Sequence, residues 1–146
     1  MSRKATKRPH RILRTRGQRI AWTNTSRLPD EQVIEAMKFV AVEADLDAVV
    51  IHWKKDGGRR RSYGMAYPEI PYIANVADLY RRRPTIIAWR YLITLTDQQH
   101  EEITPRIVNT LAHEAKHIEQ FRLDQRPSET PCIAFGAWVA DRWVGR

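Results

Sequence analysis

Two histidines and a glutamate between residues 113 and 117 have the types and the spacing of a metal site. The segment is His113-Glu114-Ala115-Lys116-His117. On a helix, residues four apart lie one above the other, so both imidazoles can bind a single tetrahedral zinc ion. Glu114 is offset from them and can reach a water molecule without binding the metal. We therefore predict that His113 and His117 are zinc ligands and that Glu114 is a general base.

A catalytic zinc normally has a third protein ligand, and Glu129 is the residue we expect in that place. Glu129 follows His117 by twelve residues and comes just after the Arg126-Pro127 break, where the chain can turn back toward the metal. Three other carboxylates are weaker alternatives because of their distance or direction along a helix. They are Glu119, Asp124 and Asp141.

Other residues with chemical potential carry less specific signals. The remaining histidines are scattered singly, at His10, His52 and His100. A tyrosine hydroxyl or an arginine could stabilise a developing oxyanion, and the sequence does not choose among Tyr63, Tyr67, Tyr72, Tyr91 and Arg90. The single cysteine, Cys132, excludes an internal disulfide and a cysteine-rich zinc site. Any metal is therefore expected to be held by histidine and carboxylate, with Cys132 packed rather than reactive.

The metal-binding segment is predicted to lie within a long helix. Thr104 as cap and Pro105 in the first turn favour a helix that runs to about Leu123, before Pro127. A last helix should cover residues 128–142. An earlier helix is indicated between residues 32 and 44, where apolar residues recur at three- and four-residue spacing.

Strands are expected to support these helices. The candidate strands are residues 19–23, 47–55, 59–67 and 86–96. Asp56-Gly57-Gly58 indicates a hairpin that pairs the second and third strands antiparallel, with Arg59-Arg60-Arg61 on an exposed edge. The last strand should be central, with alternate residues from Ile87 to Leu95 on one face. The prediction is an α+β fold, a small and mostly antiparallel sheet packed on the site-bearing helix with flanking helices.

The length of 146 residues fits one domain, and the net charge of +8 is concentrated at one end. Residues 1–29 contain nine basic side chains and no acidic one, so the other 16 basic and 17 acidic side chains nearly cancel. We predict a flexible basic arm at residues 1–18 and a folded domain at 19–146. No apolar run could cross a bilayer, so a cytoplasmic protein without membrane contact is expected.

At this point the chain resembles a known family, the minimal zincin metallopeptidases of gluzincin type. The resemblance covers the predicted helix, hairpin and long strand, the segment Leu111 to Gln120, the pair Ser128-Glu129 and the final helix. It implies a zincin-like domain with Zn2+ held by His113, His117 and Glu129 and with Glu114 as general base. It also implies that an extended peptide adds to the strand that precedes the active-site helix. A weaker similarity is to SprT-like proteases that act near DNA, which use a third histidine that this sequence lacks after His117.

Two functions follow as expectations. The first is a zinc metallopeptidase that hydrolyses peptide bonds in a protein or peptide substrate with metal-activated water. The second is a non-catalytic protein that keeps the zincin scaffold and uses its basic arm to bind nucleic acid or a large assembly. Such binding should weaken steeply with salt.

Overall fold

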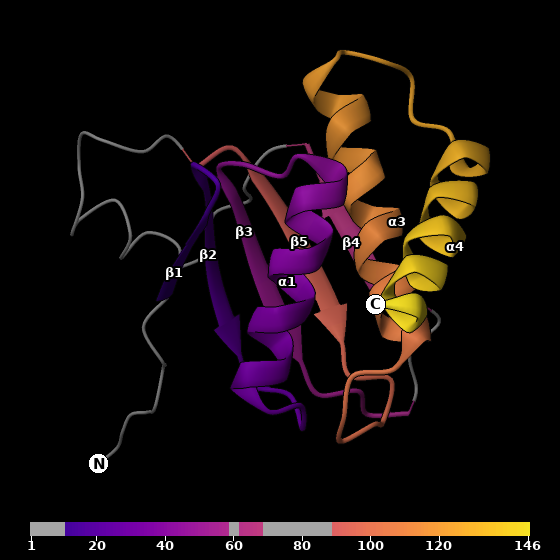
Figure 1. The fold of residues 1–146 in the computed structure, drawn as a ribbon. Helices are drawn as coiled ribbons and strands as arrows, with labels where there is room; N and C mark the ends of the chain where they lie inside the picture. Colours follow the sequence, from indigo (N-terminus) through magenta and orange to yellow (C-terminus); the bar gives the residue numbers. More distant parts are fainter. Residues whose placement is uncertain (1–10, 59–61, 69–88) are drawn as a thin grey trace.

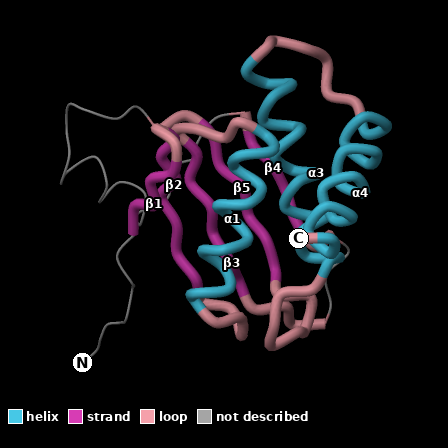
Figure 2. The backbone as a smooth tube through the Cα atoms, viewed as in Figure 1, coloured by secondary structure: helices cyan, strands magenta, loops and turns pink. Residues whose placement is uncertain are grey.

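A mixed five-stranded sheet forms the centre of the protein, and helices lie against it (Figures 1 and 2). The computed structural model describes residues 11–58, 62–68 and 89–146. The strands are β1 (Arg11–Thr15), β2 (Gln18–Asn24), β3 (Val49–Lys54), β4 (Gly64–Tyr67) and β5 (Tyr91–Thr96). Their order across the sheet is β1-β2-β3-β5-β4. The described part of the chain is therefore α+β, as the sequence predicts.

The strand pairing differs from the predicted antiparallel sheet. β2 and β5 both run parallel to β3, while β1 and β4 are antiparallel to their neighbours β2 and β5. The predicted hairpin between β3 and β4 is wrong, because β5 lies between them. Gly58 does adopt the positive φ of a turn, at +84°. A turn residue fixes only the local direction of the chain, and it does not decide which strand becomes the neighbour.

Alternate residues of the strands face two different layers. Ile20, Ile51, Ile93 and Leu95 belong to the large core that the helices cover. Ala21, Val50 and Leu92 belong to a smaller cluster on the opposite face, which Trp89 joins. Trp89 was expected on the same face as Leu95, which is wrong. Because β5 begins only at Tyr91, Trp89 precedes the strand and does not follow its alternation. Residues 69–88, which include Ile87, lie outside the described residues.

The described helices agree closely with the sequence prediction. They are α1 (Asp30–Ala44), α3 (Pro105–Arg122) and α4 (Glu129–Gly145). The Thr104 hydroxyl accepts a hydrogen bond from the Ile107 amide at 3.2 Å and so caps α3 as predicted. Buried residues from all three helices join the same core. In the described residues, no helix combines the length and apolar character needed to cross a membrane.

The first strand overlaps the segment predicted as a flexible arm. β1 pairs with β2, and Arg11 forms an ion pair with Asp30 at 3.0 Å. Ile12 and Leu13 pack against the two faces of the sheet, which provides the apolar burial that the arm was thought to lack. The predicted arm is therefore corrected at residues 11–18, and residues 1–10 lie outside the described part.

Candidate metal centre

The predicted site is built where α3 and α4 pack against each other. The two helices lie side by side and run in opposite directions (Figure 1). A Cβ atom on Gly136 would lie only 2.4 Å from Asn109 Oδ1 and 2.9 Å from the Asn109 carbonyl oxygen, so glycine is what allows this close approach. The first turn of α4 is thereby placed beside the histidine-bearing turn of α3.

His113, His117 and Glu129 come together as the sequence analysis expects of three ligands. One carboxylate oxygen of Glu129 is 2.9 Å from His113 Nε2, and the other is 3.0 Å from His117 Nε2. Zinc binds nitrogen and oxygen at about 2.0–2.2 Å, which places two ligand atoms of a tetrahedral site about 3.3–3.5 Å apart. The observed distances are a few tenths of an ångström shorter, so small side-chain shifts would make room for the ion.

The three alternative carboxylates do not join this cluster. Glu119 forms an ion pair with Lys116 at 2.7 Å. Asp124 is exposed just beyond α3, where it has a positive φ of 55°, and Asp141 is exposed on α4. Among these acidic residues, Glu129 is the one that contacts both histidines.

Gln120 fixes the orientation of His117, a role that no pattern in the sequence indicated. The Gln120 side chain donates from Nε2 to the Ser128 carbonyl oxygen at 3.0 Å and accepts at Oε1 from the Ser128 amide at 3.2 Å. The Ser128 backbone cannot exchange donor and acceptor, so it determines which end of the Gln120 amide is oxygen. That oxygen lies 3.0 Å from His117 Nδ1, and Nδ1 must therefore carry a hydrogen.

His117 therefore donates from Nδ1 to Gln120, while its Nε2 faces the Glu129 carboxylate. Neutral histidine has only one N–H, so a proton or a metal ion must lie between Nε2 and the Glu129 carboxyl group. Burial disfavours the Glu129 carboxylate, but the hydrogen bond from His113 and the two nearby imidazoles outweigh it and lower the Glu129 pKa. The donor set of two histidines and one carboxylate is also one that zinc prefers. The residues present therefore fit a zinc ion.

Glu114 occupies a different environment on the same helix turn. Its side chain is buried, and in the described residues its carboxylate forms no hydrogen bond or ion pair. Burial raises the Glu114 pKa, an effect that His113 and His117 partly oppose. A Cβ built on Gly64 would lie 3.2 Å from Glu114 Cγ, so strand β4 passes directly beside this glutamate.

Cys132 also belongs to the site, although the sequence analysis expected only core packing. Its side chain is buried on the face of α4 that packs on α3. One ligand atom each of His113, His117 and Cys132 lie within 4.8 Å of one another. Burial and the nearby Glu129 and Glu114 carboxylates raise the Cys132 pKa to about 11. The thiol was unremarkable in sequence because its histidine neighbours are far from it along the chain.

Strand β4, and not β5, borders the site at the sheet edge. β5 pairs with β3 on one side and with β4 on the other, so the predicted addition of a peptide to β5 is wrong. β4 is the last strand in the sheet order, which confirms the expected edge strand between residues 59 and 67 for its described part.

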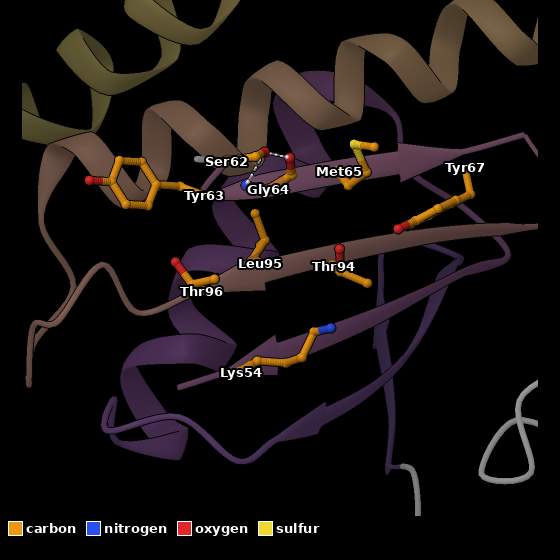
Figure 3. Close-up of a pocket in the computed structure, with 9 residues that line it drawn as sticks. All are labelled: Lys54, Ser62, Tyr63, Gly64, Met65, Tyr67, Thr94, Leu95 and Thr96. Carbon is orange, nitrogen blue, oxygen red and sulfur yellow. Dashed lines mark hydrogen bonds between the residues drawn. The ribbon is translucent and has the colours of Figure 1, made fainter. Parts of the chain in front are cut away.

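Among the described residues, no hydrogen bond joins a candidate oxyanion residue to His113 or His117. Tyr67 lies on the sheet face opposite α3, where it packs with Ala21, Val50 and Leu92. Tyr63 and Tyr67 line a hollow of about 140 Å³ over β3, β4 and β5, and neither His113 nor His117 lines it. Figure 3 draws the residues around this hollow. The Arg90 guanidinium lies over the Tyr91 ring, and Tyr72 is outside the described residues. His52 lies on β3, His100 is exposed in the loop before α3, and His10 is not described.

Comparisons with known proteins do not identify a family or a function for this chain. No protein-family model matches the chain, and the searches of curated proteins and of solved structures returned no significant match. The zincin resemblance therefore stays a prediction.

Proposed function

We propose that this protein is a zinc-dependent metallopeptidase with a zincin-like arrangement of sheet and active-site helix. The observation that carries the proposal is the Glu129 carboxylate, which joins the Nε2 atoms of His113 and His117 across two helices. These three residues would hold the ion. Zinc bound there would supply a Lewis acid that polarises the carbonyl of a peptide bond.

Glu114 is the residue we assign to proton transfer. Its carboxylate lies close enough to His113 and His117 for their charges to oppose the rise in its pKa that burial causes. Among the described residues no donor holds this carboxylate, so it is free to accept a proton. The raised pKa makes that proton more stable on the carboxyl group than it would be in water. Glu114 would take this proton from the attacking water as the water oxygen bonds to the peptide carbonyl carbon, and pass it to the amine nitrogen as the carbon–nitrogen bond breaks.

The position of β4 suggests how a substrate is presented. An extended peptide can add to the edge of a sheet through main-chain hydrogen bonds. Among the described strands, β4 lies at the edge of the sheet, and Gly64 within it lies beside Glu114. We therefore place the substrate peptide along β4, with its scissile bond next to the α3 cluster. This replaces β5, the strand that the resemblance implied.

A proteolysis assay with zinc-loaded protein tests the proposal. Wild type should hydrolyse an unfolded protein such as casein, and Glu114→Gln should lower the rate by about 10²–10⁴-fold while its zinc content stays unchanged. Glu119→Gln is the matched control, because Glu119 is on the same helix and pairs with Lys116 instead of facing the site. Zinc-loaded wild type that cleaves neither casein nor a library of extended peptides would contradict the catalytic role and favour a non-catalytic scaffold.

Nucleic-acid binding by the basic segment stays a separate proposal. Three of its nine basic residues already pair with carboxylates: Arg11 with Asp30, Arg19 with Asp47 and Arg27 with Asp97. Arg14 and Arg16 are exposed and, among the described residues, form no such pair. The slope of the logarithm of DNA affinity against the logarithm of salt concentration should therefore correspond to fewer than nine neutralised phosphates. A salt slope unchanged by Arg14→Ala and Arg16→Ala would exclude these two residues.

A further inference from the structure

We propose that Cys132 is a fourth ligand of the metal held by His113, His117 and Glu129, so that the coordination sphere of the resting protein is closed. This inference rests on the proposed zinc site, and it changes the character of that site. A zinc centre with four protein ligands has the closed form of a structural site, whereas a catalytic centre keeps one position open. A thiol ligand would have to leave before the site could act on a peptide.

The position of Cys132 on α4 favours ligation. Cys132 follows Glu129 by three residues, so both side chains project from the same side of the first helical turn. Cys132 also shares its face with the other buried residues of α4, which are Gly136, Val139, Ala140 and Trp143. That face packs on α3, where Gly136 approaches Asn109 closely. Because the two helices run in opposite directions, Cys132, one turn before Gly136, lies level with His113, one turn after Asn109.

The distances between the thiol and the two imidazoles require little movement. Zinc binds sulfur at about 2.3 Å and nitrogen at about 2.0–2.1 Å, which separates the two ligand atoms of a tetrahedral site by about 3.6 Å. The ligand atoms of His113, His117 and Cys132 already lie within 4.8 Å of one another. The thiol therefore needs to shift by no more than about 1.2 Å relative to each imidazole, which a change at χ1 and a small helix adjustment can provide.

The hydrogen bond that now holds the thiol can be given up at low cost. Cys132 Sγ donates to the Ser128 carbonyl oxygen at 3.2 Å, and a thiol is a weak donor. The same oxygen accepts from Gln120 Nε2 at 3.0 Å, so it keeps a partner when the thiol turns away. Ligation is not a redox step, because the sulfur–metal bond forms as the S–H bond breaks and the proton is released to solvent.

Cobalt spectroscopy tests this ligand directly. The metal-free protein is titrated with Co2+, whose thiolate complexes show an intense sulfur-to-metal charge-transfer band in the near ultraviolet. Wild type should show the band at one Co2+ per chain, and Cys132→Ser should bind one Co2+ without it. Ile133→Ser is the matched control, because it places serine at an exposed neighbour on the same helix and should keep the band.

The outcomes separate this inference from the proposed function. Stoichiometric Co2+ binding by wild type without the charge-transfer band would overturn the thiol ligand and leave the three-residue site intact. Failure of wild type to bind Co2+ or Zn2+ at all would overturn both. A second readout is zinc affinity, which should fall by at least about 10-fold in Cys132→Ala. An unchanged affinity would contradict a metal–sulfur bond.

Discussion

Asp97 and Glu114 are both buried carboxylates, yet their surroundings are opposite. Asp97 is fully buried and accepts hydrogen bonds from the amides of Arg27 and Asp56 at 2.9 and 3.0 Å and from the Arg27 guanidinium at 2.9 Å. Burial opposes its ionisation, but these donors and the Gln99 amide outweigh burial and lower its pKa. Glu114 has no such donor among the described residues, and burial raises its pKa.

The difference separates a structural carboxylate from one available for chemistry. Asp97 joins three loops, those around Arg27, Asp56 and Gln99, and its charge is used entirely in holding them together. Glu114 remains uncommitted within a cluster that also contains two histidines and a second carboxylate. A general base must be able to exchange its proton, and a carboxylate held by several donors is poorly suited to that role.

The largest effect expected on stability comes from Asp97→Ala. The substitution leaves the Arg27 guanidinium and the amides of Arg27, Asp56 and Gln99 without their shared acceptor. Removing one partner of a buried ion pair typically costs about 3–5 kcal/mol. The free energy of unfolding in urea measures the loss. Glu101→Ala, at an exposed residue of the same loop, should change it by less than about 0.5 kcal/mol. A loss below about 1 kcal/mol for Asp97→Ala would contradict the structural role.

Removal of the Gln120 amide should weaken the metal site without touching a ligand. Gln120→Leu takes away the acceptor for His117 Nδ1 and the contacts to Ser128, so zinc affinity should fall by about 10–100-fold. Isothermal titration with zinc measures the change, and the exposed Gln125→Leu is the control. Equal affinities in the two variants would show that Gln120 does not position His117.

Glu114→Gln should have the opposite effect on stability to loss of Asp97. A carboxyl group whose folded pKa is raised costs stability above that pKa, while below its unfolded pKa it is protonated in both states and the cost disappears. The metal-free variant should therefore be more stable than wild type at pH 7, by about 0.5–2 kcal/mol. The gain should vanish near pH 4. Urea unfolding at the two pH values measures it, and a variant less stable at pH 7 would show that the carboxylate has a partner.

The smallest effect is expected at the surface. Arg142 pairs with Glu43 at 2.9 Å, but half of the arginine side chain is exposed, so the ion pair gains little over hydration. Arg142→Ala should lower the unfolding free energy by no more than about 1 kcal/mol. A loss comparable to that of Asp97→Ala would contradict the expectation that an exposed ion pair contributes less to stability than the buried hydrogen bonds of Asp97.

The sequence predicted the features that depend on neighbours along the chain. The Thr104-Pro105 start of α3, the apolar spacing of α1 and the position of the His-Glu-x-x-His segment are all local signals, and the observed helices agree with them. Glu129 was identified because a short loop after α3 must return the chain to the same region. Its approach to both histidines agrees with that expectation.

Features that depend on distant segments were missed or wrong. Gly58 adopts the positive φ expected of a turn residue, but the place beside β3 is taken by β5, about forty residues further along the chain. Cys132 was considered inert because its proximity to His113 and His117 arises only when Gly136 allows α4 to pack on α3. The role of Gln120 depends on the Ser128 backbone, whose direction no residue pattern reveals.

The central claim is that this cluster binds one metal ion, and elemental analysis after equilibration with zinc and removal of free metal tests it most directly. Wild type and the control His100→Ala should retain about one zinc per chain, because His100 is exposed and away from the cluster. His113→Ala and Glu129→Ala should retain much less, since each loses a ligand. Wild type without zinc, or full retention by both variants, would contradict the account.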